Sequence, residues 1–250
     1  MAGFAYVDDT DLIQTKRLAS DSIEDIVDEL QGSLDVWQGT LRATGGALDC
    51  DDPNKSYWYS IDYEWNKHGR WKYCEFNDDL ELTMNNDKGD RTVAPHCHTN
   101  EAHRTLGVML APDDNNEAQV TMMRKIASKF GDSIRTGFIK GHDVMQALMT
   151  TARRSLNWSL PAVTISETEC NHIMAPIIKN VLAKLQIVST IKRDVIYGPI
   201  HLQGMGLKNL YTQLGAMHIS LLLQFYGSDT DLGRMIQNTM ECITMELGTQ

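Results

Sequence analysis

The apolar and polar positions of this 250-residue chain first predict two β-hairpins. A short β-prone run at residues 3–7 is followed by the polar stretch 8–11 and then by two more apolar residues. Because Asp tolerates the turn conformations that β-branched residues resist, this order predicts a tight hairpin. Residues 56–76 hold two aromatic-rich runs on either side of the turn-forming stretch 66–69, which predicts a second hairpin.

A helix is predicted between these hairpins, because apolar residues recur there at steps of three and four. They are Ile23, Ile26, Val27, Leu30, Leu34, Trp37 and Leu41. Ser20 or Ser22 can cap the first turn, and Gly45 with Gly46 can end the helix. Residues 77–104, in contrast, are polar and predict irregular structure, most flexible near its Asn- and Gly-containing centre.

The second half of the chain has helical spacing. A short strand is expected over residues 105–110, ending before Pro112. Asp113 or Asn115 can then cap a helix that runs to about Phe130. Further helical stretches are predicted at about 140–157, 166–187, 207–224 and 229–247. The predicted fold class is therefore α+β, with hairpins and a helix over residues 1–112 and an α-helical region over residues 113–250.

The sequence does not have the features expected of a membrane or secreted protein. No apolar run approaches the roughly 20 residues that span a bilayer. Asp8, Asp9 and Asp11 interrupt the stretch that a signal peptide would need. The five cysteines are scattered without a repeated spacing, which indicates free thiols in a reducing compartment. We expect an intracellular protein.

Charge differs between the two halves. Residues 1–120 hold 10 Lys or Arg and 24 Asp or Glu, whereas residues 121–250 hold 13 and 9. An acidic half that can hold divalent cations thus precedes a mildly basic half that can face a phosphate backbone. Solvated surface charge on both halves explains the same counts.

The adjacent carboxylates Asp8 and Asp9 carry the clearest chemistry. Like charges about 4 Å apart repel by roughly 4 kcal/mol at an effective dielectric near 20. A divalent ion offsets this repulsion, and two such ions can activate a 3′-hydroxyl and stabilise a leaving pyrophosphate. An exposed turn is the alternative explanation for an isolated Asp-Asp pair.

The context of this pair resembles the palm domain of reverse transcriptases. Ala5-Tyr6-Val7-Asp8-Asp9 is similar to the polymerase signature, and the extended form FAYVDDTDLIQT is like that of non-LTR retrotransposon enzymes. A helix follows, then a glycine-rich turn with a lysine, from Gly45 to Lys55, which looks like the fourth palm motif. Thr105-Leu106-Gly107-Val108 resembles the short strand that grips the primer end. The helical remainder occupies the position of the thumb.

The resemblance implies a role for each matching residue. Asp8 and Asp9 would face Mg²⁺, the first as the firmer ligand, and Tyr6 would lie beside the primer terminus. Lys55 would approach the incoming triphosphate, where an ammonium neutralises departing phosphate; an ordinary surface lysine is the alternative. Leu106, Gly107 and Val108 would lie under the primer, although a strand glycine can also mark a bulge. The implied partners are an RNA template and a DNA primer, in the nucleus or cytoplasm.

The family's palm also uses a metal-binding aspartate on an earlier strand and fingers that hold template and nucleotide. Only five residues precede Tyr6 in this sequence. We therefore expect the fragment alone to bind Mg²⁺ weakly and to lack polymerase activity. The alternative hypothesis is a non-catalytic remnant that binds RNA, DNA or a protein through its helical half. Oligomeric state is not predicted.

Other motifs give weaker signals. His96-Cys97-His98 with His103, and Cys170 with His172, do not match zinc half-site spacings, and we interpret them as unrelated side chains. The glycines near 198–206 lack the Lys-Ser/Thr pair of a phosphate loop. The C-terminal methionines are interpreted as core residues; they are Met205, Met217, Met235, Met240 and Met245.

Basic residues with nearby aromatics form the last candidate in the helical half. They are Arg153, Arg154, Lys192 and Arg193, with Trp158 and Tyr197. Such residues can contact a nucleic-acid backbone and stack on bases. A solvated helix end accounts for them equally well.

Overall fold

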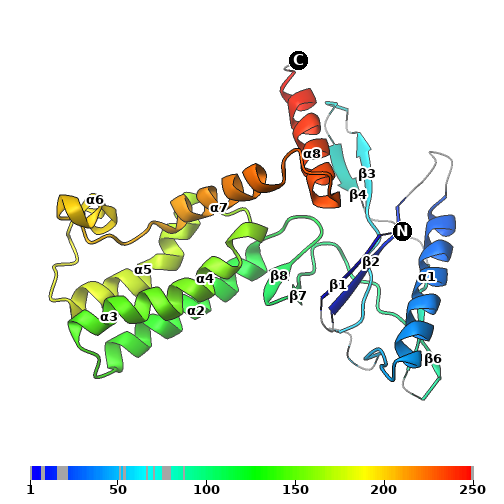
Figure 1. The fold of residues 1–250 in the computed structure, drawn as a ribbon, viewed down its shortest axis with the longest axis horizontal. Helices are drawn as coiled ribbons and strands as arrows, with labels where there is room; N and C mark the ends of the chain where they lie inside the picture. Colours follow the sequence, from blue (N-terminus) through cyan, green and yellow to red (C-terminus); the bar gives the residue numbers. More distant parts are fainter. Residues whose placement is uncertain are drawn as a thin grey trace. The chain divides into compact units, whose positions relative to one another are not determined.

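A computed structural model shows an α+β protein, as the sequence predicts (Figure 1). It describes residues 2–6, 9–15, 22–50, 52, 55–65, 67–69, 71–74, 80–86 and 88–248. The chain divides into two compact units, and each is described by itself. Unit 1 comprises Met1–Leu106 and Ala111–Asn115, and unit 2 comprises Gly107–Leu110 and Asn116–Gln250. The predicted boundary at residue 112 falls in the stretch where the chain passes between the units.

Two predicted hairpins are confirmed in unit 1. Strands β1 (Ala2–Tyr6) and β2 (Asp9–Ile13) pair antiparallel from Ala2↔Ile13 to Tyr6↔Asp9. Strands β3 (Asp62–Trp65) and β4 (Trp71–Cys74) form the second hairpin. Trp65 and Trp71 flank the second turn as predicted, whereas residues 9–11, predicted in the first turn, belong to strand β2.

The predicted helix is α1 (Ile23–Ala43), and its cap is Ser22. The Ser22 hydroxyl accepts a hydrogen bond from the Asp25 backbone N–H, and the Asp25 carboxylate accepts one from the Ser22 N–H, which is a capping box. One face of α1 contributes to a small apolar core. The buried residues of this core are Val27, Trp58, Leu82, Met84 and Ala94.

A third hairpin lies where irregular structure is predicted, so that prediction is wrong for part of residues 77–104. Strands β5 (Thr83–Asn85) and β6 (Arg91–Val93) pair antiparallel, and Asn86 organises the turn between them. The Asn86 side-chain oxygen accepts hydrogen bonds from the backbone N–H groups of Lys88 and Asp90, at 3.0 and 2.8 Å. Short polar strands escape prediction because they have no apolar alternation.

Two glutamines of α1 cover the outer edge of β5. The Gln31 side chain donates to the Thr83 carbonyl at 2.9 Å and accepts from the Thr83 N–H at 2.8 Å. The Gln38 oxygen accepts from the Asn85 N–H at 3.1 Å. These amides take the place of a neighbouring strand and satisfy the exposed edge of the hairpin.

The single strand predicted at residues 105–110 is instead a hairpin of β7 (His103–Thr105) and β8 (Val108–Leu110). Leu106 and Gly107 form its turn with φ of 49° and 85°. Two successive residues with positive φ reverse the chain, and Gly107 adopts this conformation without a steric penalty.

Unit 2 is helical, and its longer predicted helices are confirmed. The helices are α2 (Glu117–Thr136), α3 (Gly141–Ala147), α4 (Arg153–Trp158), α5 (Glu167–Lys184), α6 (Arg193–Tyr197), α7 (Leu210–Phe225) and α8 (Asp231–Leu247). A π-helical turn (Leu148–Ala152) joins α3 to α4. The predicted cap of α2 is wrong: Asn116 holds that position and makes no side-chain cap. None of the described helices is long and apolar enough to cross a bilayer.

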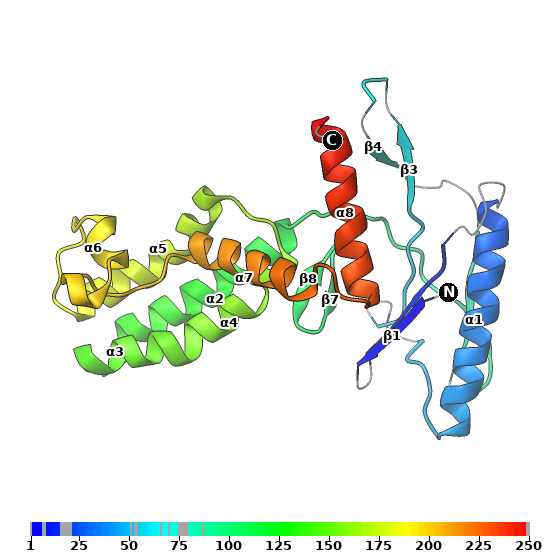
Figure 2. The ribbon, with the colours of Figure 1, turned by 45° about the horizontal axis from the view of Figure 1, so that its top comes forward.

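The core of unit 2 is continuous and apolar. Figures 1 and 2 show α2, α4 and α5 side by side, and α2 packs most extensively on α5. Gly131 permits a close approach, because a Cβ there would lie 3.0 Å from the Pro176 carbonyl oxygen. The most completely buried side chains include Met123, Leu156, Leu160, Ile173, Ile177 and Leu182.

The interpretation of the C-terminal methionines as core residues is wrong for α8. Met235, Met240 and Met245 are 50, 38 and 71% exposed, whereas Met205 and Met217 pack against the core. Helix α8 contacts α7 but contributes no side chain to the buried cluster of unit 2. Its apolar stripe therefore remains largely exposed.

Candidate metal and nucleic-acid sites

The described residues of the proposed polymerase signature lie at one end of the β1–β2 hairpin. Tyr6 and Asp9 are the last pair of the ladder, on either side of Val7 and Asp8. Val7, Asp8 and the side chains of Tyr6 and Asp9 lie outside the described residues. The described strands thus bring Tyr6 and Asp9 directly opposite each other at the end of a two-stranded hairpin.

Lys55 lies in a tight turn after α1. Its backbone N–H donates to the Asp52 carbonyl at 2.9 Å, and the residue is exposed. An exposed lysine side chain is long enough to reach a bound phosphate. The structure thus agrees with a role at a ligand and equally with an ordinary surface position.

The three predicted primer-contacting residues have different environments. Val108 is 6% exposed and belongs to the apolar core of unit 2, so its side chain cannot face a ligand. Leu106 is 45% exposed at the turn. Gly107, the next residue, is partly buried.

A cluster of metal-binding side chains forms in unit 1. The Cys97 sulfur, a Glu101 carboxylate oxygen and a His103 ring nitrogen all lie within 4.8 Å of one another. Cys97 is 6% exposed, Glu101 is exposed and His103 is partly buried. Burial, with a smaller effect of the Glu101 carboxylate, raises the pKa of the Cys97 thiol. Thiolate, carboxylate and imidazole are all ligands that Zn²⁺ accepts.

Neighbouring backbone and aromatic contacts hold this cluster in place. The Cys97 N–H donates to the Trp58 carbonyl at 2.9 Å. The Tyr59 hydroxyl donates to the Glu101 carbonyl at 2.9 Å. The ring of His103 stacks on that of Tyr57, with centroids 4.0 Å apart. Burial is also the largest cause of the raised pKa of Tyr59.

Sequence spacing did not reveal this group. Glu101 was not a candidate, because a lone glutamate in a polar stretch carries no signal. His96 was a candidate ligand, but it hydrogen-bonds Ser60 at 3.0 Å and packs on Trp58. The useful signal is the short separation of Cys97, Glu101 and His103, but only the surrounding turn brings their side chains together.

The other sequence motifs form no ligand site in the part of unit 2 that the structure describes. Cys170 is buried, and burial followed by Glu169 and Glu167 raises its pKa to about 11, whereas His172 is exposed. The glycines near 198–206 serve close backbone packing. A Cβ at Gly204 would lie 2.2 Å from the Gly198 carbonyl oxygen.

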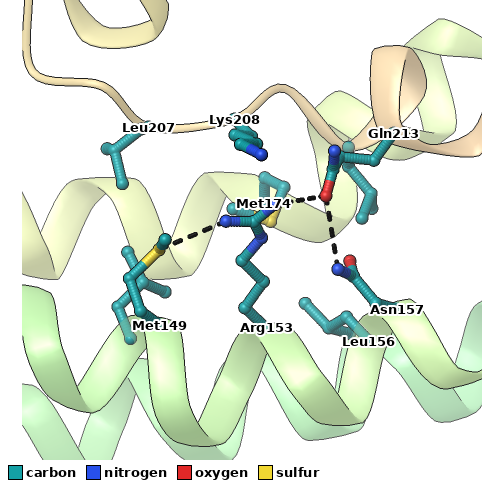
Figure 3. A pocket seen from close by; sticks show the side chains of 10 residues that line it. Met149, Arg153, Leu156, Asn157, Met174, Leu207, Lys208 and Gln213 are labelled. Carbon is teal, nitrogen blue, oxygen red and sulfur yellow. Dashed lines mark hydrogen bonds between the residues drawn. The ribbon is translucent and has the colours of Figure 1, made fainter. Parts of the chain in front are cut away.

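A small pocket in unit 2 lies beside the π-helical turn, and Figure 3 shows its polar side chains. Arg153 extends from α4 and hydrogen-bonds the Gln213 side-chain oxygen. Asn157 donates to the same oxygen at 3.3 Å, and Met149 accepts from Arg153 at 3.4 Å. Lys208 lines the opposite side. The hydrogen bond from Arg153 to Gln213 thus joins α4 to α7.

The remaining basic and aromatic candidates are mostly at the surface. Arg154 is exposed and Trp158, one helical turn later on α4, is 65% exposed. This spacing places both on one side of the helix. Lys192 and Arg193 are exposed at the start of α6, whereas Tyr197 packs partly against the core.

Comparisons with family models, with curated proteins and with solved structures found no match to this chain.

Proposed function

We propose that this chain is part of an RNA-directed DNA polymerase of the non-LTR retrotransposon type. The observation that carries the proposal is the strand register that ends at Tyr6↔Asp9, the first and last residues of the sequence Tyr-Val-Asp-Asp. A β-hairpin end is a suitable place for two adjacent carboxylates, because both can reach a shared cation.

In the proposed reaction, the chain's own residues bind metal and orient the primer. Asp8 and Asp9 would hold Mg²⁺ through their carboxylate oxygens, and the bound ion would supply Lewis-acid chemistry for nucleotidyl transfer to a primer 3′-hydroxyl. Lys55, which is exposed, would provide a positive charge for the triphosphate. Tyr6, Leu106 and the backbone of Gly107 contact the primer.

A complete polymerase site needs a further carboxylate and a nucleotide pocket besides these residues. Two carboxylates alone bind Mg²⁺ weakly, so the proposal requires a further ligand for tight metal binding. The 5′ sequence of the native transcript shows whether the reading frame supplies the rest.

The test is primer extension on an RNA template with the protein that the native transcript encodes. Asp9→Asn should abolish extension and leave RNA binding nearly unchanged, because it removes a metal ligand without changing the shape of the hairpin. Asp28→Asn, on the exposed side of α1, is the matched control and should retain activity. Loss of RNA binding together with extension would count against the assigned role.

A second candidate function is non-catalytic binding of single-stranded nucleic acid by unit 2. The observation that favours it is the exposed Trp158 with Arg154 one turn earlier. Stacking of a base on an aromatic ring contributes about 1–3 kcal/mol, and an arginine adds salt-dependent contact to phosphate. RNA binding by the present chain should then survive Asp8→Asn with Asp9→Asn and weaken at least fivefold in Trp158→Ala. Phe138→Ala, at another exposed aromatic, is the control.

A further inference from the structure

We propose that Cys97, Glu101 and His103 bind one Zn²⁺ ion, with a water molecule as the fourth ligand. This site lies entirely within unit 1, and neither Asp8 nor Asp9 is among its ligands. The polymerase proposal does not use this zinc ion.

The donor set selects the metal. Mg²⁺ and Ca²⁺ prefer oxygen ligands throughout, whereas Zn²⁺ accepts sulfur, nitrogen and oxygen together. A thiolate and a carboxylate together balance the charge of a divalent ion, so the occupied site is close to neutral. That balance lowers the cost of placing the ion beside the buried Cys97.

The geometry needs little adjustment. Tetrahedral Zn²⁺ places its sulfur, nitrogen and oxygen ligands about 3.3–3.6 Å apart. The three atoms already lie within 4.8 Å of one another. Glu101 is exposed, so its carboxylate can rotate toward the other two ligands. Because the ligands lie within seven residues, closing the site costs little chain entropy.

The surrounding contacts orient the ligands in advance. Tyr57 fixes the plane of the His103 ring by stacking, and the Trp58 carbonyl fixes the backbone at Cys97. The Glu101 N–H donates to the His98 carbonyl at 2.9 Å, which closes the turn between the ligands. Such supporting contacts strengthen metal sites by holding ligands near their bound positions.

The experiment titrates Co²⁺ into the chain after dialysis against a chelator. We expect one Co²⁺ per chain, with a sulfur-to-cobalt charge-transfer band and the visible bands of tetrahedral Co²⁺, both removed by one equivalent of Zn²⁺. Cys97→Ser should abolish the charge-transfer band. Glu101→Gln and His103→Gln should each weaken Zn²⁺ binding at least tenfold, measured by competition with a chromophoric chelator.

Matched controls change the same residue types elsewhere. Cys242→Ser, Glu81→Gln and His201→Gln, all at exposed positions, should bind Zn²⁺ as the unaltered chain does. Circular dichroism checks that every variant is folded, and Glu101→Gln keeps the test decisive because an exposed side chain can change without unfolding. A charge-transfer band that persists in Cys97→Ser, or equal affinity in all variants, would overturn the proposal.

The outcome is independent of the polymerase proposal. Asp8→Asn with Asp9→Asn should leave the cobalt spectrum unchanged, because these residues are not ligands of this site. Loss of the cobalt bands in that variant would contradict the proposed ligand set.

Discussion

The two units of this protein are stabilised in different ways. Unit 2 has a continuous apolar core in which α2 and α5 approach closely enough to require Gly131. Unit 1 has a core of a few side chains between α1 and short strands, supplemented by the amides of Gln31 and Gln38. Apolar packing thus dominates one unit, and specific polar contacts contribute strongly to the other.

This difference corresponds to where the candidate chemistry lies. The proposed polymerase carboxylates and the Cys97 cluster both belong to unit 1. Unit 2 offers a rigid helical body with an exposed tryptophan. The comparison predicts that substitutions in the two units have effects of different kind and size.

The largest effect is expected in the core of unit 2. Ile177 is completely buried, so Ile177→Ala should destabilise the unit by about 2–5 kcal/mol through lost burial and the cavity left behind. Urea unfolding followed by far-ultraviolet circular dichroism measures the loss. Val188→Ala, at a 68% exposed position, should change stability by less than about 0.5 kcal/mol. Equal losses for both would contradict the packing described.

Paired glycine substitutions sharpen the comparison. Gly131→Leu should destabilise unit 2 by about 1–3 kcal/mol, because the new side chain meets Pro176 and Asn180. Gly32→Ala in α1, where no atom lies within 4 Å of the new Cβ, should instead stabilise unit 1 by about 0.5–1 kcal/mol. Thermal unfolding measures the change in stability of each variant. A change of the same sign in both variants would contradict the packing described for the two glycines.

The polar support of unit 1 gives a smaller effect. Gln31→Ala leaves the Thr83 N–H without its partner and should destabilise unit 1 by about 1–2 kcal/mol. Four of the five tryptophans lie in unit 1, so fluorescence of a Trp158→Phe background reports on this unit. Asp28→Ala on the exposed face of α1 is the control. An unchanged urea midpoint in Gln31→Ala would exclude the proposed edge contact.

The smallest effect concerns the capping box of α5. The Ser166 backbone N–H and, second, its hydroxyl lower the pKa of Glu169. A lowered pKa means that this contribution is present at neutral pH and is lost as the pH falls below about 4. Ser166→Ala should destabilise unit 2 by about 1 kcal/mol at pH 7. The difference should shrink at pH 3, and a constant difference would argue against the carboxylate's part in the cap.

The sequence predicted the parts of the fold that have strong periodicity or turn chemistry. The face of α1, its Ser22 cap and the two aromatic or acidic hairpins were all predictable because their patterns are local. The β5–β6 hairpin was not, since its strands are short and polar and are completed by Gln31 and Gln38 from far along the chain. The α8 methionines follow a helical pattern that does not say whether a partner covers them.

Some candidate site residues could likewise be proposed from the sequence, and others only from the fold. The Tyr-Val-Asp-Asp motif could be proposed from the sequence because its residues are contiguous. Leu106 and Gly107 were expected in a strand, but their positive φ angles place them in a turn. Glu101 joined Cys97 and His103 only through the fold, so no spacing rule could identify it.

The proposed metal hairpin can be tested directly in this chain by paramagnetic broadening with Mn²⁺, after the zinc site has been saturated. The account predicts broadening of backbone amide signals centred on Tyr6 and Asp9, reversed by excess Mg²⁺ and absent from the variant with Asp8→Asn and Asp9→Asn. Broadening that is unchanged in this variant, or that centres elsewhere in unit 1, would contradict the assignment of these carboxylates as the metal ligands.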